Sequence, residues 1–293
     1  MIWIILVNYN GAKDTAECIE SLRRVKSPPF RVVVVDNAST DKSPDALNAL
    51  QAQYAFDLLP SPANGGFAAG CNLGMRFALD RGADYLLLLN NDTLVTEGFL
   101  DGLLSSFRED ARCGASTCRI RFAAQTDTLW YAGGSVSPVT LRTRHFGYGQ
   151  PDRETPGPSR AVSFASGCCL MLRREAVLAA GFLDEDFFLY EEDTDYCLRL
   201  REKGFSIRYV PGAVIDHKVS ASVRASAAGS FYQIRSKYLL IQKRLPPLRR
   251  PAAYLSCTAR CLVRCMRGEY RLHDLRRALS SFLRGGKGKD ASV

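Results

Sequence analysis

Strands and helices are predicted to alternate through about the first 90 residues, and this pattern limits the fold more than any other feature. Short apolar runs typical of buried strands are each followed by a segment with apolar residues at helical spacing. Strands are expected at 2–7, 31–35, 56–59 and 85–89, and helices at 14–25, 44–53 and 68–81. Such alternation is typical of βαβ units. We therefore predict an α/β fold with a mostly parallel central sheet flanked by helices.

Polar side chains stand where two of these strands end. Asn90, Asn91 and Asp92 follow one, and Asp36 follows another. Ligands of open α/β sheets bind beyond the carboxyl ends of the strands. We expect Asp92 to hold a divalent metal ion that could in turn hold a diphosphate. Asp36 could accept hydrogen bonds from a ribose or a nucleobase, although a turn-capping role is the alternative.

The first strand lacks the glycine-rich phosphate loop of dinucleotide-binding folds. Residues 8–11 read Asn-Tyr-Asn-Gly instead of G-x-G-x-x-G. Phosphates would therefore need another source of positive charge, and a metal ion on Asp92 would supply it.

Four carboxylates crowd into five residues at Glu191, Glu192, Asp193 and Asp195, directly after an apolar run. Like charges and burial both raise a carboxyl pKa, which suits a general base. An acidic helix N-terminus favoured by the helix dipole is the alternative. His217 could complete a site begun by Asp92, although a surface or capping histidine is the alternative.

Positive charge is concentrated at the end of the chain. Of the formal net charge of +9, +8 lies from Arg249 onward, so the body is near neutral and we expect no nucleic-acid binding by it. Arginines at 260, 264, 267 and 271 share a helical face, with apolar surface from Tyr254, Leu255, Leu262 and Met266. A basic amphipathic helix of this kind lies on anionic lipid. A solvated helix packed on the domain is the alternative, and residues 285–293 look disordered.

The cysteines indicate a reducing compartment. There are ten of them, and no C-x-x-C pair or secreted disulfide framework is present. Cys257, Cys261 and Cys265 are expected to form a small apolar helix face. No apolar run approaches the length of a membrane span, so we expect a cytoplasmic protein.

Five linked motifs resemble the family 2 glycosyltransferases, particularly the bacterial rhamnosyltransferase-like branch. The resemblance covers about residues 2–245, and the motifs that carry it are Asn8-Tyr9-Asn10, the segment 35–41, the segment 64–74, Leu89-Asn90-Asn91-Asp92, and the segment 181–199. The resemblance implies a GT-A fold in residues 1–245, with a nucleotide-binding half at about 1–112 and an acceptor half at 113–245. Residues 246–293 would form a basic amphipathic helical tail.

The resemblance also implies an activity. It is inverting transfer of a sugar, with rhamnose as the first guess, from a nucleoside-diphosphate (dTDP or UDP) donor with Mg²⁺ or Mn²⁺. The acceptor would be a lipid-linked saccharide or polysaccharide in bacterial surface-glycan synthesis. The basic tail suits peripheral contact with an anionic membrane, at the inner face of the plasma membrane.

Site residues follow from the same resemblance, position by position. The residues that it implies for nucleotide binding are Asn8, Tyr9, Asn10, Asp36, Asn64, Gly66, Asn72 and Asn91. Asp92 would ligate the metal, with His217 as second ligand. Glu192 and Asp193 occupy the acidic pair, with Asp193 as the base. Asn90 stands where the family often has an acid, which leaves one certain carboxylate ligand. Arg235 could contact an acceptor diphosphate, or be an exposed, solvated arginine.

Two other functions remain open from sequence. A nucleotidyltransferase would use similar acids at strand ends, but it predicts a basic phosphate-clamping loop, and residues 8–13 hold only Lys13. A non-catalytic nucleotide-sugar-binding scaffold is the second alternative, against which Asp92, Asp193 and His217 weigh.

Overall fold

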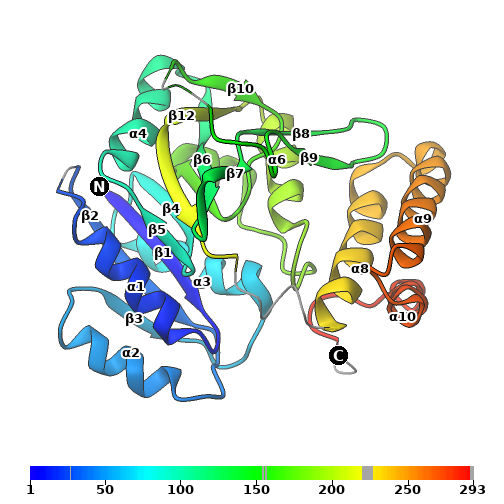
Figure 1. Cartoon of the computed structure of the whole chain (residues 1–293), viewed down its shortest axis with the longest axis horizontal. Helices are drawn as coiled ribbons and strands as arrows, with labels where there is room; N and C mark the ends of the chain where they lie inside the picture. The colour runs from blue at the N-terminus through cyan, green and yellow to red at the C-terminus, as the bar shows by residue number, and fades with distance from the viewer. Residues whose placement is uncertain (27, 154, 156, 220–226, 291–293) are drawn as a thin grey trace.

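A computed structural model describes residues 1–26, 28–153, 155, 157–219 and 227–290 (Figure 1). Its strands are β1 (Ile2–Asn8), β2 (Phe30–Asp36), β3 (Asp57–Pro60), β4 (Tyr85–Asn90), β5 (Thr93–Val95), β6 (Cys113–Phe122), β7 (Gln125–Tyr131), β8 (Gly134–Val136), β9 (Thr143–His145), β10 (Arg160–Val162), β11 (Cys169–Arg173) and β12 (Ser206–His217). Its helices are α1 (Ala12–Leu22), α2 (Ser43–Gln51), α3 (Gly66–Asp80), α4 (Phe99–Glu109), α5 (Arg174–Ala180), α6 (Glu192–Glu202), α8 (Ala227–Arg244), α9 (Arg250–Met266) and α10 (Leu272–Leu283), with a 3₁₀ turn at Pro247–Arg249.

The main sheet has the order β10-β12-β6-β11-β4-β1-β2-β3. The predicted strands β1 to β4 are parallel to one another. In the β1–β2 register Asn8 lies opposite Asp36, and in the β1–β4 register Val7 lies opposite Asn90. Leu86 to Leu89 of β4 are almost fully buried. The predicted α/β architecture is confirmed, and the polar ends of three strands meet at one edge of the sheet.

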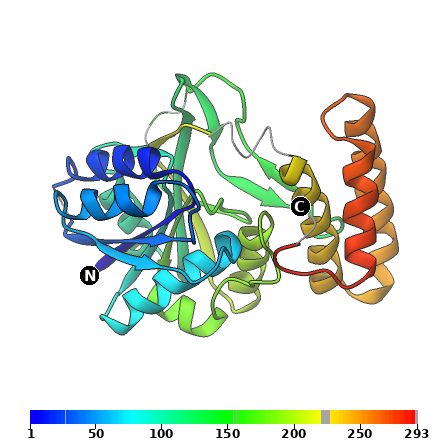
Figure 2. The same cartoon turned by 90° about the horizontal axis from the view of Figure 1, so that it is seen from below.

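Helices cover both faces of this sheet. Figure 2 shows α1 and α2 together on one face and α3 on the opposite face. Two glycines one turn apart let α3 lie close to β1. A Cβ on Gly70 would stand 2.7 Å from Val7 Cγ1, and one on Gly74 would stand 2.5 Å from Ile5 Cγ2. Helix α3, which begins within the 64–74 motif, is thereby held tightly against the sheet.

The second half of the sheet differs from expectation. The sequence pattern over 113–165 predicts irregular strands and loops, but β6 is a ten-residue strand between β11 and β12. The pattern over 162–172 predicts one strand interrupted at Gly167. Instead β10 and β11 are separate strands in different places in the sheet. Strand β11 runs antiparallel to β4, opposite Leu86 to Leu89. These pairings join segments far apart in the chain, so local patterns do not reveal them.

The C-terminal helices α8, α9 and α10 pack together beside the sheet (Figure 2). Tyr238 of α8 stacks on Tyr254 of α9 with ring centroids 5.3 Å apart. Cys257 and Cys261 are buried, which confirms the predicted apolar cysteine face. Tyr254, which was predicted to add apolar surface beside the arginines, is half-buried and packs against Tyr238 and Phe282. None of the described helices is long and apolar enough to cross a membrane.

The prediction that the end of the chain is disordered is wrong for the residues that the structure describes there. Residues 285–290 are not disordered, since the Gly288 amide donates to the Asp186 carbonyl at 2.7 Å and the Asp290 amide donates to Tyr232 Oη at 3.0 Å. Residues 291–293 lie outside the described part. Arg235, which from sequence could contact an acceptor diphosphate or be an exposed, solvated arginine, is 1% exposed. It donates to the Gly288 carbonyl, so the returning chain covers it.

Candidate active site

The ends of β1 and β2 are joined by a buried hydrogen-bond network. Asn8 is fully buried, and its Nδ2 donates to Asp36 Oδ1 at 2.9 Å. Asp36 also accepts from the Ser39 hydroxyl at 2.6 Å. Asn8 Oδ1 in turn accepts from the Thr15 hydroxyl at 2.9 Å. Asn8 therefore orients Asp36 rather than presenting its own amide to solvent.

Asn10 joins the loops after these two strands. Its backbone adopts a φ of +54°, which asparagine tolerates better than most residues. Its Oδ1 accepts from the backbone amide of Thr40 at 2.8 Å, and its backbone amide donates to the Ser39 hydroxyl at 2.9 Å. Tyr9, between Asn8 and Asn10, is 45% exposed. This edge of the sheet thus offers an accessible aromatic ring, that of Tyr9, and a carboxylate held in place by hydrogen bonds, that of Asp36.

Asn64 and Gly66 shape the loop before α3. Asn37 Nδ2 donates to Asn64 Oδ1 at 3.1 Å and to the Gly66 carbonyl at 3.0 Å. Gly66 has a φ of +85°, and a Cβ there would stand 2.0 Å from the Phe188 carbonyl oxygen. Glycine is required because the loop touches the 187–191 segment, which leads into the acidic pair. Sequence reasoning did not single out Asn37, although it lies within the quoted motif.

The side chains of Asn91 and Asn72 make hydrogen bonds that hold different parts of the fold together. Asn91 Nδ2 donates to the Thr15 hydroxyl at 2.9 Å, which joins the end of β4 to α1. Asn72 is 2% exposed; its Nδ2 donates to the Leu183 carbonyl at 2.9 Å, and its Oδ1 accepts from the Leu183 amide at 2.9 Å. The structure does not bring Asn72 to the cavity described below. It ties α3 to the segment before the acidic turn.

Asp92 and His217 meet although 125 positions separate their numbers in the chain. Strand β5 pairs with β12, so that Thr93 lies opposite His217. His217 Nε2 lies 3.1 Å from Asp92 Oδ1, and both residues are less than 10% exposed. The Lys218 amide donates to the Asp92 carbonyl at 2.9 Å, which fixes the two segments together.

This pair fits a divalent metal ion. Two ligands at about 2.1 Å on adjacent corners of an octahedron stand about 3 Å apart, close to the observed separation. Carboxylate oxygen and imidazole nitrogen both suit Mn²⁺. Among the described residues, no group of three or more His, Cys, Asp or Glu side chains could hold a metal. A metal ion at this position would need further ligands from a bound molecule, and diphosphate oxygens are suitable.

The four-acid cluster divides into two carboxylates that pair with cations and two that make no such ion pair among the described residues. Asp195 is fully buried and pairs with Arg199 at 2.9 Å and with Arg244 of α8. Glu191 pairs with Lys237 Nζ at 2.6 Å. The expected mutual repulsion is relieved for these two by cations. Glu192 and Asp193 remain at the start of α6.

Burial controls the ionisation of this pair. Burial raises the pKa of Asp193 to about 6, opposed by the hydrogen bond that its Oδ2 accepts from the Gly167 amide at 3.0 Å. Burial raises the pKa of Glu192 well above its usual value, and the charge of Asp193 raises it further. Glu192 Oε2 has no hydrogen-bond partner among the described residues. Asp193 therefore ionises more readily than Glu192 and is the carboxyl of the pair that can accept a proton near neutral pH.

One cavity of about 420 Å³ joins these groups. Asp92 and His217 line it, and so do Glu192 and Asp193. It lies beyond the carboxyl end of β4, where α/β folds bind ligands. A ligand in this cavity would contact the metal pair and the acidic pair together.

An aromatic wall of the cavity was missed from sequence. It consists of Trp130, His145, Tyr148 and Phe164. Trp130 packs edge-on against His217 with centroids 4.8 Å apart, and His145 stacks on Phe164 at 5.4 Å. Burial lowers the pKa of His145 to about 4, so this imidazole is neutral. The many aromatic residues between positions 130 and 148 could have indicated this wall from sequence, although the segment was predicted to consist of irregular strands and loops.

Comparison with known proteins identifies the family. Residues 3–179 match Glycosyl transferase family 2. The N-acetylglucosaminyl-diphospho-decaprenol L-rhamnosyltransferase of Mycobacterium tuberculosis is 30% identical over 261 residues, covering 82% of this chain and 84% of that protein. The dTDP-rhamnosyl transferase RfbF of Shigella flexneri is 25% identical over 258 residues, covering 84% and 82%. The chain belongs to glycosyltransferase family 2, as the sequence motifs predicted, and is a glycosyltransferase whose relatives include rhamnosyltransferases.

A solved structure supports the GT-A fold. The mannosyltransferase PcManGT of Pyrobaculum calidifontis, in complex with GDP-Man and Mn²⁺, superposes with a TM-score of 0.62 at 16% identity. The match covers 96% of this chain and 86% of that one. The predicted fold class is confirmed.

Proposed function

We propose that this protein is an inverting, metal-dependent glycosyltransferase of bacterial surface-glycan synthesis. Its donor is a nucleoside-diphosphate sugar and its acceptor a lipid-linked saccharide or polysaccharide. The observation that carries the proposal is the shared cavity, which has the Asp92–His217 pair and the Glu192–Asp193 pair on its walls. A transferase needs both: a place for the leaving diphosphate and a base for the acceptor hydroxyl.

The donor nucleotide occupies the polar edge formed by β1, β2 and β4. Asp36, fixed by Asn8, accepts hydrogen bonds from the ribose or base. Tyr9 offers an exposed ring, and Asn10 and Asn64 hold the flanking loops in place. The names of the two relatives favour rhamnose, with dTDP as carrier, and UDP is the second candidate.

Asp92 and His217 would hold Mg²⁺ or Mn²⁺ at the cavity wall. When bound, such an ion would supply positive charge to the diphosphate leaving group. Asp92 is ordered before ligand arrives, because β5–β12 pairing places His217 against it. Preorganisation of this kind lowers the cost of assembling the site.

Asp193 removes the acceptor proton. Its two oxygens accept hydrogen bonds from the backbone amides of Gly167 and Thr194 at 3.0 and 2.6 Å, which fixes the carboxylate. The acceptor oxygen attacks the anomeric carbon on the face opposite the leaving diphosphate, so the configuration inverts. Burial raises the pKa of Glu192 well above its usual value and that of Asp193 to about 6, so Asp193 is the member of the pair suited to act as base.

We also propose a division of labour along the chain and a location. Residues 1–245 form the catalytic unit, with a nucleotide half at about 1–112 and an acceptor half at 113–245, and residues 246–293 form a basic tail. The tail makes peripheral contact with the inner face of the plasma membrane. Exposed Leu255 and Met266 on α9 support this location.

Ligand-induced thermal stabilisation tests the donor site. Purified protein is heated with UDP-, dTDP- and GDP-sugars, each with Mn²⁺, Mg²⁺ or EDTA. Stabilisation by one nucleotide class that EDTA abolishes is the expected result. If no donor stabilises the protein in the presence of metal, the transferase proposal fails and the scaffold alternative loses its nucleotide-sugar ligand as well.

A further inference from the structure

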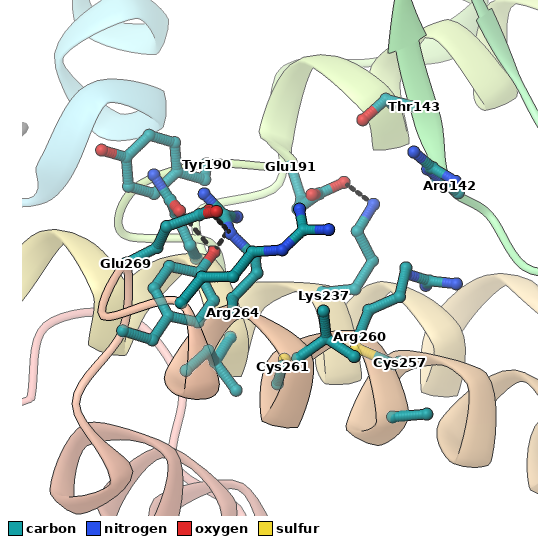
Figure 3. A pocket seen from close by; sticks show the side chains of 16 residues that line it. Arg142, Thr143, Tyr190, Glu191, Lys237, Cys257, Arg260, Cys261, Arg264 and Glu269 are labelled. Atoms are coloured by element: carbon teal, nitrogen blue, oxygen red, sulfur yellow. Dashed lines mark hydrogen bonds and ion pairs between the residues drawn. The ribbon is translucent and has the colours of Figure 1, made fainter.

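A second, larger cavity of about 690 Å³ lies beside the active site (Figure 3). The segment before β9, helix α8 and helix α9 form its walls. Figure 3 shows side chains from these three elements facing the same space: Arg142 directly before β9, Lys237 from α8, and Arg260 and Arg264 from α9. The proposed catalytic step uses none of these four.

This cavity is strongly cationic. Five cations line it, namely Arg142, Lys237, Arg260, Arg264 and Arg267, against the carboxylates of Glu191 and Glu269. Lys237 pairs with Glu191 at 2.6 Å, and Arg264 pairs with Glu269 at 2.8 Å. Within the described part of the chain, the other three arginines have no carboxylate within ion-pair distance. The cavity thus has a surplus of positive charge that an anion would neutralise.

The cationic cavity opens onto the active site. Thr143, Tyr190, Glu191 and Gln233 line both cavities. Glu191 directly precedes Glu192 and Asp193, so the wall that the two cavities share lies next to Asp193, the proposed base. Asp36, Asp92 and His217 do not line the cationic cavity. It therefore adjoins the acidic pair and not the donor-binding edge of the sheet.

An apolar stripe lies on α9 next to the arginines. Leu255, Leu262 and Met266 are 73%, 44% and 80% exposed. Their spacing of seven and four places them on one face of the helix. Val263, 40% exposed, lies between this stripe and Arg260 and Arg264, and it lines the cavity. A molecule with an anionic group in the cavity could continue along α9 as a hydrocarbon chain.

We propose that this cavity binds the diphosphate of a polyprenyl-diphosphate-linked acceptor. Arginine pairs with phosphate oxygens through two parallel hydrogen bonds, and several arginines around one group suit a diphosphate. The saccharide attached to the diphosphate would extend along the shared wall to Asp193, and the lipid would leave over α9. The proposal rests on the proposed function, whose acceptor it specifies, but the cavity can be tested alone.

Calorimetric binding of farnesyl diphosphate, a short soluble probe, tests the proposal without any donor. The double variant Arg142→Gln/Arg260→Gln should bind the probe about ten- to hundredfold more weakly than wild type, as expected for lost charged hydrogen bonds. Arg276→Gln on α10 removes an exposed arginine outside the cavity and serves as the matched control. It should bind the probe as wild type does.

Two results would overturn the proposal. One is equal affinity of wild type and the double variant for farnesyl diphosphate. The other is equal affinity of wild type for farnesyl diphosphate and inorganic diphosphate, which would show a free-anion site and no lipid contact. Melting temperatures of both variants report folding. If no nucleotide sugar stabilises wild type while the farnesyl diphosphate results hold, the donor assignment fails and the cavity assignment stands.

Discussion

His217 Nε2 lies 3.1 Å from Asp92 Oδ1, which joins the last strand of the sheet to the end of its central strand. Asp92→Ala should lower the rate of sugar transfer more than it lowers the melting temperature, because the proposed metal loses its only carboxylate ligand. We expect a rate loss of about a hundredfold or more. Nucleotide-sugar stabilisation in Mn²⁺ should disappear as well. Asp80→Ala, an exposed carboxylate at the end of α3, is the control and should behave as wild type.

Asp195 tests whether the acidic cluster is divided as the structure shows. Asp195→Ala should lower the free energy of unfolding by about 1.5–3 kcal/mol, because it removes the buried carboxylate that accepts from the half-buried Arg199 and Arg244, of which Arg244 keeps Glu202 as a partner. Denaturant unfolding measures the change. Little destabilisation would mean that Asp195 is not the buried ion-pair partner seen here.

The pH dependence of transfer should report Asp193. The base must be ionised, and burial raises its pKa to about 6, so the rate should rise between pH 5 and pH 7 with a midpoint near 6. A midpoint near the ordinary value of 3.8 would show that the carboxylate is not desolvated in the working enzyme.

Gly66 tests the contact between the nucleotide loop and the acidic turn. Gly66→Ala should lower stability and transfer together, since its Cβ would collide with the Phe188 carbonyl. Gly82→Ala is the matched control. It has a similar positive φ of +76° but nothing within 4 Å of the added carbon, so only the backbone strain of about 1 kcal/mol applies. Equal melting temperatures for the two variants would contradict the proposed steric contact.

Sequence patterns predicted the first half of the fold because its strands and helices are local and regularly spaced. Asp36 and Asp92 could be placed at one edge for the same reason. Strand β6 and the placement of β11 could not be predicted, since they depend on pairing between distant segments. Without the family resemblance, the residue pattern does not separate the roles of Asp193 and Asp195, because Arg244, one of the two arginines that pair with Asp195, lies 49 residues later in the chain. The burial of Arg235 could not be predicted either, because it depends on residues 285–290 packing back against α8.

The Asp193→Asn variant tests the central claim most directly. The measurements are single-turnover transfer with saturating donor and Mn²⁺ and the melting temperature at pH 7.5 and pH 4. The account predicts a rate loss of about 10²–10⁴-fold for removal of a general base. It also predicts a higher melting temperature at pH 7.5 only, because ionising Asp193 costs stability above its unfolded pKa of 3.8 and the full cost applies above about 6. Unchanged transfer would contradict the mechanism and favour a non-catalytic role for this cavity.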